Sequence, residues 1–302
     1  EKNPLFFVSL GEGPDVPAHL RAPEGRVKNL KLQKGPTEHL LRQIWRAKAA
    51  NGLGVPLPEY LVQFFGDEPP AKIAEWCYSL RHALLLYKED ADFDIFSSIL
   101  NGEIHEDVYH SQNAMCEQVL RIAMSLDKGN KGKAERAKFF KMLQKDMGKS
   151  VEACLQLDSA LVEDQGTGKL FNPAELFKED EEFNQGAFAE LLRDQFLDER
   201  KRYMDQVEME LSKASLEKAG KIKASDALAA LQEVDPDKPV SDHLNTIFYC
   251  MDTSPIEKEA LAETPLELEA FMARLRMRAI QIGPKKGKPT HHAPAPAPAK
   301  KK

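Results

Sequence analysis

Residues 127–138 read DKGNKGKAERAK, and residues 163–174 read EDQGTGKLFNPA. Each stretch is polar, has a central glycine (Gly132 and Gly168), and separates apolar stretches with helical periodicity. The two glycines lie thirty-six positions apart. The pattern predicts two consecutive helix–loop–helix units, with helices over residues 106–126, 134–147, 151–162 and 173–177.

The first stretch has the spacing of an EF-hand calcium loop but lacks its ligands. Such a loop places oxygen ligands at positions 1, 3 and 5, glycine at position 6, and a bidentate glutamate at position 12. Counted from Asp127, positions 3, 5 and 12 are Gly129, Lys131 and Lys138. Because two ammonium groups would face the cation, we expect no calcium binding at this loop.

The second stretch retains more oxygen atoms. Counted from Glu163, it offers Gln165 and Thr167, but it ends in Ala174, with Glu175 one place late. We expect at most weak calcium binding there, and we expect Leu170 in a short ladder between the two loops. Either loop alone is also compatible with an ordinary glycine-rich helix connection, whereas their spacing favours a degenerate EF-hand pair.

Helical periodicity continues through most of the remaining chain. Further helices are predicted from residue 36 and over 58–65, 70–87, 92–100, 187–213, 225–234, 240–251 and 265–282. The heavily charged helix over 187–213 is expected to project or to bridge between lobes. The fold class is therefore all-α, with degenerate EF-hand-like helical pairs preceded by a small helical domain, and with an extended N-terminal arm and a C-terminal tail.

These elements predict seven regions along the chain. They are an N-terminal arm (1–35), a helical domain (36–103), the EF-hand-like pair (104–178), an acidic connector with the long helix (179–213), a second EF-like pair (214–252), C-terminal helices (253–282) and a basic Pro/Ala/Lys tail (283–302).

Composition favours a soluble protein of the cytoplasm. The chain is 42% hydrophobic and 30% charged, and we find no signal peptide and no apolar run of membrane-spanning length. Its four cysteines are far apart and form no CxxC pair, so we expect reduced core thiols rather than a zinc site or disulfides.

Charge is distributed unevenly. Residues 283–302 carry six lysines and no acid. The formal net charge of the first 282 residues is therefore −12, compared with −6 for the whole chain. The acidic body argues against nucleic-acid binding. Lys285, Lys286 and Lys288 of the tail would suit an acidic surface such as the microtubule wall, where tubulin would be the partner; the alternative is a solubilising end.

Two further segments are candidate interaction sites. The proline- and glycine-rich arm carries four cations that would grip a neighbouring protein or lie in a surface coil: Arg21, Arg26, Lys28 and Lys31. The helix from residue 36 places Leu40, Ile44 and Trp45 on one face among basic residues. Such a face is compatible with a calmodulin-binding helix, but it is more often part of a core.

Signs of catalysis are weak. His105, Glu106 and His110 lack the four-residue histidine spacing of a zinc-protease helix, and Gly148-Lys149-Ser150 follows a predicted helix rather than a strand. We therefore predict a non-enzyme with no catalytic residue, no cofactor and no metal site.

Several segments, taken in order, resemble the translin-associated factor X-interacting protein 1 family, specifically its C-terminal half. The resemblance covers about residues 14–284. The segments are VPAHLRAPEGRVKNLKLQK (16–34), EHLLRQIWRAK (38–48), EWCYSL (75–80), FSSILNGEIHEDVYHSQ (96–112), LFKEDEEFNQGAFAELLRDQFLDERKRYMDQVEMEL (176–211), LQEVDPDKPVSDHLNTIF (231–248) and RMRAIQIGP (276–284).

The resemblance implies a non-catalytic protein of cilia or flagella. It implies a subunit of a large axonemal assembly. The first candidate for that assembly is a projection of the central-apparatus microtubules, and the second is a radial spoke. The coiled-coil half of the vertebrate members is not represented in this sequence, so a partner bound through that half is not implied. The alternative is a calcium- or calmodulin-linked regulatory subunit of the axoneme.

Overall fold

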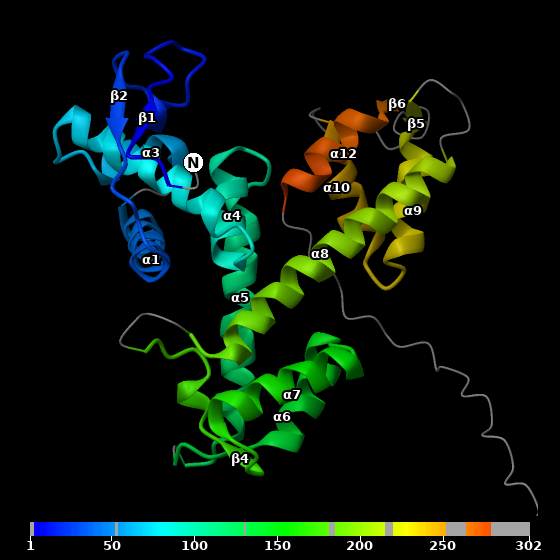
Figure 1. Cartoon of the computed structure of the whole chain (residues 1–302). Helices are drawn as coiled ribbons and strands as arrows, with labels where there is room; N and C mark the ends of the chain where they lie inside the picture. Colours follow the sequence, from blue (N-terminus) through cyan, green and yellow to red (C-terminus); the bar gives the residue numbers. More distant parts are fainter. Residues whose placement is uncertain are drawn as a thin grey trace, which may run out of the picture.

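The computed structural model describes residues 3–51, 54–129, 131–180, 185–214, 220–251 and 264–278. These residues form eleven α-helices and six strands of two or three residues each, so the coarse prediction of a mostly helical fold is confirmed. Figure 1 shows three lobes joined by the long helices α5 and α8. Within the described residues, no helix combines the length and the apolar character that crossing a bilayer requires.

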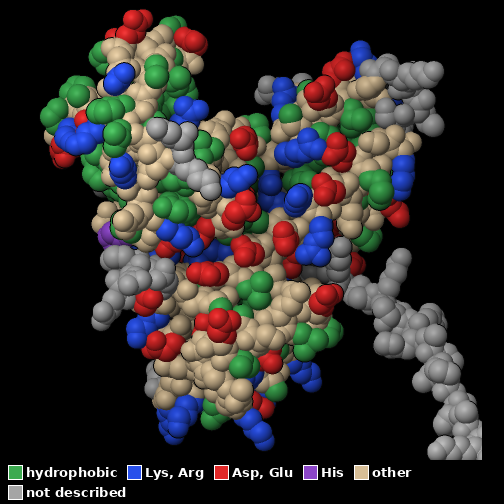
Figure 2. Space-filling view, in the orientation of Figure 1, with side chains coloured by type: hydrophobic (Ala, Val, Ile, Leu, Met, Phe, Trp, Pro, Cys, Tyr) green, Lys and Arg blue, Asp and Glu red, His purple; other side chains and the backbone are tan. Residues whose placement is uncertain are grey.

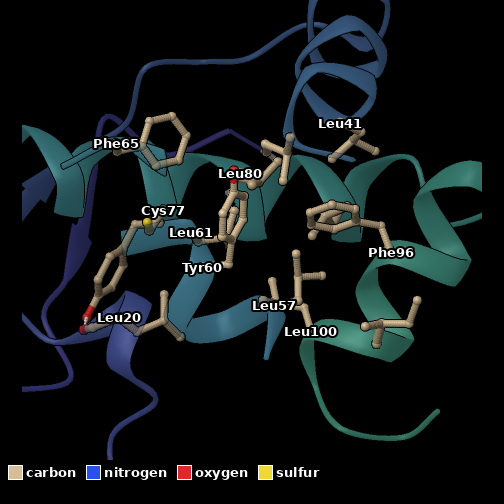
Figure 3. Packing of buried hydrophobic residues seen from close by; sticks show 14 of the residues in the cluster. Leu20, Leu41, Leu57, Tyr60, Leu61, Phe65, Cys77, Leu80, Phe96 and Leu100 are labelled. Atoms are coloured by element: carbon tan, nitrogen blue, oxygen red, sulfur yellow. Dashed lines mark hydrogen bonds between the residues drawn. The ribbon is translucent and has the colours of Figure 1, made fainter. Parts of the chain in front are cut away.

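The N-terminal lobe surrounds the first hydrophobic core. Figure 3 shows side chains from several elements meeting there, including Leu20, Leu41, Leu61, Leu80 and Phe96. The elements are β1 (Phe6–Val8), the 3-10 helix η1 (Ala18–Leu20), β2 (Arg26–Lys28), α1 (Lys34–Asn51), α2 (Leu57–Phe64), α3 (Pro70–Leu86) and α4 (Ala91–Leu100).

The segment predicted as an arm packs on its own lobe. Strands β1 and β2 pair in antiparallel fashion, with Phe7 opposite Val27. Tyr78 fixes the loop between the strands, because its hydroxyl accepts from the Leu10 N–H at 2.7 Å and donates to the Leu20 carbonyl at 2.9 Å. Residues 3–33 are therefore part of the fold.

The middle lobe consists of two helix–loop–helix units. Its elements are α5 (Glu106–Leu126), β3 (Ala134–Glu135), α6 (Arg136–Met147), α7 (Val151–Gln165), β4 (Leu170–Phe171) and the 3-10 helix η2 (Pro173–Glu175). Gly148 ends α6 in the left-handed conformation (φ 66°), and Ser150 then caps α7 by accepting from the Ala153 N–H. The core includes Val119, Phe139, Leu157 and Leu161.

The third lobe contains two pairs of helices, α8 with α9 and α10 with α12, and a ladder of two strands. Its elements are α8 (Ala187–Ala214), β5 (Lys221–Lys223), α9 (Ala224–Val234), α10 (Val240–Met251), β6 (Pro265–Glu267) and α12 (Leu268–Met277). The prediction of a helix from Pro265 is wrong for three residues, because residues 265–267 pair with β5 before the helix begins. Residues 279–282 of that prediction lie outside the described part.

Helix α8 contributes side chains to all three cores. Phe188 and Leu192 are buried in the middle core, Phe196 and Leu197 pack against the N-terminal core, and the third core includes Tyr203, Met204, Val207 and Leu211. At about 1.5 Å per residue, its twenty-eight residues span roughly 42 Å. The predicted bridging role of this helix is confirmed.

Candidate functional site

The loops of the middle lobe meet in a two-residue antiparallel ladder. Ala134 pairs with Phe171, and Glu135 pairs with Leu170, as expected for Leu170. Ala134 is the eighth residue counted from Asp127, and its partner Phe171 is the eighth counted from Asp164. The pairing therefore makes Asp164, rather than Glu163, the counterpart of Asp127, and it places Glu175 at position 12 of the second loop.

Asp127 binds the backbone of its own loop. Its two carboxylate oxygens accept from the Lys131 N–H at 2.9 Å and the Gly132 N–H at 2.8 Å. Burial raises the pKa of this carboxyl, but hydrogen bonds from the Gly132, Lys133 and Lys131 N–H groups outweigh burial, and the net shift is downward. The carboxylate thus closes the loop by binding its backbone.

An amide side chain closes the second loop. Gln165 donates to the Asn172 carbonyl at 3.1 Å, and its Oε1 accepts from the Asn172 N–H at 2.7 Å. From the first unit, the Arg136 guanidinium donates to the Gly166 carbonyl at 2.7 Å and lies 3.2 Å from the Asp158 carboxylate. Arg136 therefore joins the two loops directly.

Asp164 caps the long helix α8. Its two oxygens accept from the Ala187 N–H at 2.7 Å and the Phe188 N–H at 2.9 Å. A Cβ at Gly186 would come within 2.6 Å of this carboxyl, so the approach requires glycine there. The N-terminus of a helix carries partial positive charge, which a carboxylate stabilises. The Asp164 carboxylate therefore serves as the N-terminal cap of α8.

The remaining candidate ligands are few. Positions 3 and 5 of the loop counted from Asp164 are Gly166 and Gly168, and Glu175 lies 3.0 Å from the Lys178 ammonium. In the residues that the structure describes, no group of three or more His, Cys, Asp or Glu side chains could hold a metal ion. These loops can fix the relative positions of helices, which is an architectural role.

The third lobe has a longer ladder. Ile222 pairs with Leu266, and both side chains are buried in the third core. Lys221 pairs with Glu267, and their side chains lie 3.2 Å apart. Beyond the strands, the Ala224 N–H donates to the Thr264 carbonyl, and the Leu268 N–H donates to the Gly220 carbonyl.

A polar junction lies where α1, α4 and α8 meet, and Figure 2 shows acidic and basic side chains gathered between the lobes. It contains a cleft of about 430 Å³. Asp92 lies 3.9 Å from Arg42 and 3.7 Å from Arg193, and Lys34 lies 3.0 Å from Asp90. Burial, followed by the charge of Asp90, raises the pKa values of Glu38, Glu190 and Asp194. Of these ion pairs, the one between Asp92 and Arg193 joins the N-terminal lobe to α8.

The structure separates the predicted interaction residues into three groups. Ile44 and Trp45 are buried in the N-terminal core, with Leu40 partly buried beside them, and the Trp45 ring stacks on Tyr109 at 4.1 Å. Calmodulin could reach this face only if α1 left the core. Lys285, Lys286 and Lys288 lie outside the described residues.

The four cations of the predicted arm are exposed. Arg21 donates to the Pro14 and Val16 carbonyls and so stabilises the loop between β1 and β2. Arg26 and Lys28 lie on one face of β2, and Lys31 has a positive φ of 54° just after it. The structure therefore brings Arg26 and Lys28 together and gives Arg21 a local structural contact.

Sequence reasoning missed Asp164, Gln165 and Arg136 as the residues that hold the loops. Counted from its glycine, the second loop starts at Glu163, whereas counted from the ladder it starts at Asp164 and has Lys169 at position 6. The available signal for a start at Asp164 was Glu175. It lies at position 13 when the loop is counted from Glu163, and at position 12, where an EF-hand loop has its glutamate, when the loop is counted from Asp164.

Comparison with known proteins reveals distant homology. The chain is 25% identical over 294 residues to "Translin-associated factor X-interacting protein 1" of Mus musculus, and 26% identical over 297 residues to the protein of the same name in Homo sapiens. Each alignment covers 94% of this chain but only 41% and 44% of the respective relatives, so the chain spans less than half of their length. No protein-family model and no solved structure matches the chain significantly.

Proposed function

We propose that this chain is a non-catalytic structural subunit of a ciliary or flagellar axonemal complex, with a projection of the central-apparatus microtubules as the first candidate and a radial spoke as the second. The carrying observation is the use of loop carboxylates as structural clamps: Asp127 binds its own loop, and Asp164 caps α8. We further infer that the middle lobe is an EF-hand-like pair that works without an ion.

The shape of the molecule supports a scaffold. One helix contributes to three separate cores, so the positions of the lobes are coupled through a rigid element of roughly 42 Å. Distant homology covering nearly the whole chain supports the family, while the axonemal location rests on the resemblance of the quoted segments. The relatives' name refers to an interaction with translin-associated factor X, which is a property of those longer proteins.

Locating the protein in motile cilia tests this proposal. A tagged chain should remain with detergent-extracted axonemes, and electron tomography should place the tag on one repeating projection. Deleting the chain should remove density at that same place. Recovery of the chain only in the detergent-soluble fraction, with unchanged axonemes in its absence, would refute the proposal.

The regulatory alternative has a separate test. Calmodulin binding would have to expose Trp45, which is 7% exposed and stacked on Tyr109. We therefore expect no calcium-dependent calmodulin capture by the folded chain in a pull-down with and without chelator. Capture that a Trp45→Ala change abolishes would favour the alternative.

A further inference from the structure

The ribbon formed by β1 and β2 has one buried face and one exposed face. Phe7 and Val27 point inward, where the Phe7 ring lies 6.0 Å from the Tyr78 ring. Phe6 and Val8 point outward and are 49% and 80% exposed. Opposite them on β2 lie Lys28 and Arg26, also exposed. We call these four outward residues the outer ribbon face: Phe6, Val8, Arg26 and Lys28.

Exposed apolar side chains are concentrated at this place. Of the thirteen large hydrophobic residues that are exposed in the described part of the chain, four lie within six consecutive positions: Leu5, Phe6, Val8 and Leu10. Figure 2 shows hydrophobic and basic side chains next to one another on the lobe that carries the ribbon. Single exposed apolar residues are ordinary, but a contiguous group marks an interaction surface.

The ribbon is held firmly from within. The Leu30 N–H donates to the Ser79 hydroxyl at 2.8 Å, and the Ser9 hydroxyl donates to the Ala22 carbonyl at 2.8 Å. The Ser79 and Tyr78 hydroxyls tie the ribbon to α3, and the Ser9 hydroxyl ties the end of β1 to the loop that leads to β2. A partner would therefore meet a preformed surface and would lose little ordering entropy there.

The outer edge of β1 presents backbone groups as well as side chains. The Asn29 N–H donates to the Leu5 carbonyl, and the Ser9 N–H donates to the Gly25 carbonyl. In an antiparallel pair, hydrogen-bonded positions alternate along each strand. The backbone N–H and carbonyl groups of residues 5, 7 and 9 therefore point toward β2, and those of Phe6 and Val8 point away from it.

The charge of the outer ribbon face is positive. Its two charged residues are Arg26 and Lys28, and neither has an ion-pair partner in the part of the chain that the structure describes. Glu24, the acid nearest to Arg26 in the sequence, belongs to the loop between the strands, as do Glu12 and Asp15. A complementary ligand would carry carboxylates beside apolar side chains.

We propose that β1 and the outer ribbon face dock an extended segment of a partner protein, which adds to the free edge of β1 as a third strand. Its alternate apolar side chains pack beside Phe6 and Val8, and its carboxylates reach Arg26 and Lys28. Strand addition of this kind takes affinity from main-chain hydrogen bonds and specificity from alternate side chains. The proposal rests on the proposed adaptor function and identifies one surface through which it acts.

Two variants at one position test the strand geometry. Val8→Pro removes the outward N–H but leaves the β1–β2 ladder intact, because that N–H faces away from β2 and proline is tolerated on edge strands. Val8→Thr keeps the N–H and the branched shape. Each variant also carries a photo-crosslinking benzoylphenylalanine at Phe6, and its unfolding temperature confirms that it folds.

Crosslinking is performed in gently prepared extracts of ciliated cells, with Ser159 on α7 as the control position. We expect Phe6 to crosslink to a segment with alternating apolar residues and Asp or Glu. Val8→Thr should keep the yield, whereas Val8→Pro should lower it about tenfold, as the loss of one main-chain hydrogen bond predicts. Arg26→Glu with Lys28→Glu should also lower it.

Four results would overturn the proposal. They are a crosslink yield no higher than at Ser159, a crosslink to a second copy of this chain, a crosslink to a segment without carboxylates, and equal yields for the proline and threonine variants. Presence of the chain in axonemes is scored separately. Its absence there would refute the axonemal function, while the crosslinks would still decide whether the ribbon docks a strand.

Discussion

The β3–β4 and β5–β6 ladders join similar pairs of helices, but they differ in length and in the side chains around them. The first has two residue pairs and is surrounded by side-chain-to-backbone bonds from Asp127, Gln165 and Arg136. The second has three residue pairs, with Ile222 and Leu266 buried at its centre. A short ladder is thus reinforced by polar side chains, and a longer one by an additional pair and an apolar centre.

This comparison predicts that the two lobes respond separately to damage. Cysteines report on each of them, because Cys154 is buried in the middle core and Cys250 in the third. Burial raises the pKa values of both thiols, that of Cys250 to about 12. A buried thiol reacts with a labelling reagent only when its surroundings open. Labelling rates therefore measure local opening in each lobe.

The largest effect is expected for Phe139→Ala. The Phe139 side chain is fully buried and contacts the rings of Phe171 and Phe188, so its removal should cost about 3–5 kcal/mol of unfolding free energy. Labelling of Cys154 should accelerate more than labelling of Cys250. Equal acceleration would mean that the two lobes open as one unit and would remove the distinction between them.

Ile222→Ala tests the second ladder in the same way. The Ile222 side chain is 3% exposed, and its truncation should cost about 2–5 kcal/mol. Here Cys250 should become the faster thiol, and Cys154 should change little. Ile222→Val is the matched control, with a loss of about 0.5–1.5 kcal/mol. A loss from Ile222→Ala no larger than that from the control would contradict an apolar centre.

Asp164→Ala should have a smaller effect, about 0.5–2 kcal/mol, because it removes a helix cap. Chemical denaturation measures the loss. Asp164→Asn keeps one of the two accepting oxygens and should recover only part of the stability, because its amide NH2 cannot accept from the second N–H. Glu163→Ala removes a neighbouring carboxylate that caps nothing in the described structure. Equal losses at positions 163 and 164 would indicate that the cap contributes nothing.

Calcium should have the smallest effect. Because the Asp127 and Asp164 carboxylates already bind backbone N–H groups, we expect no heat of binding at either loop and no shift of the unfolding temperature with calcium or chelator. Titration calorimetry on the intact chain measures this. Stoichiometric micromolar binding would contradict our interpretation of the first ladder.

Local sequence patterns predicted most helices, but not how their loops are held. Apolar periodicity placed α3 and α5 within a residue or so of their ends, because both helices bury one face. The Asp164 cap joins residues twenty-three positions apart, and Gly186 permits it only through a close approach. Contacts of this kind depend on tertiary packing and leave no periodic signal.

The interaction residues show the same limit. Basic charge correctly indicated an exposed Arg26 and Lys28, whereas the periodicity around Trp45 was equally compatible with a core and with a binding face. The hydrophobic half of the proposed docking surface was missed, because Phe6 and Val8 lie in a proline- and glycine-rich stretch whose pairing with β2 is not evident from the sequence.

The end of α12 returns to the start of α5. The His105 N–H donates to the Met277 carbonyl at 2.5 Å, and the Arg278 guanidinium lies 3.4 Å from the Asp107 carboxylate. A pulling force applied between the N-terminal ribbon and residue 278 would therefore enter α5 through these two links and bypass both ladders. The seam between α5 and α12 would therefore carry the load first, and the two ladders would be shielded from the force for as long as the seam holds.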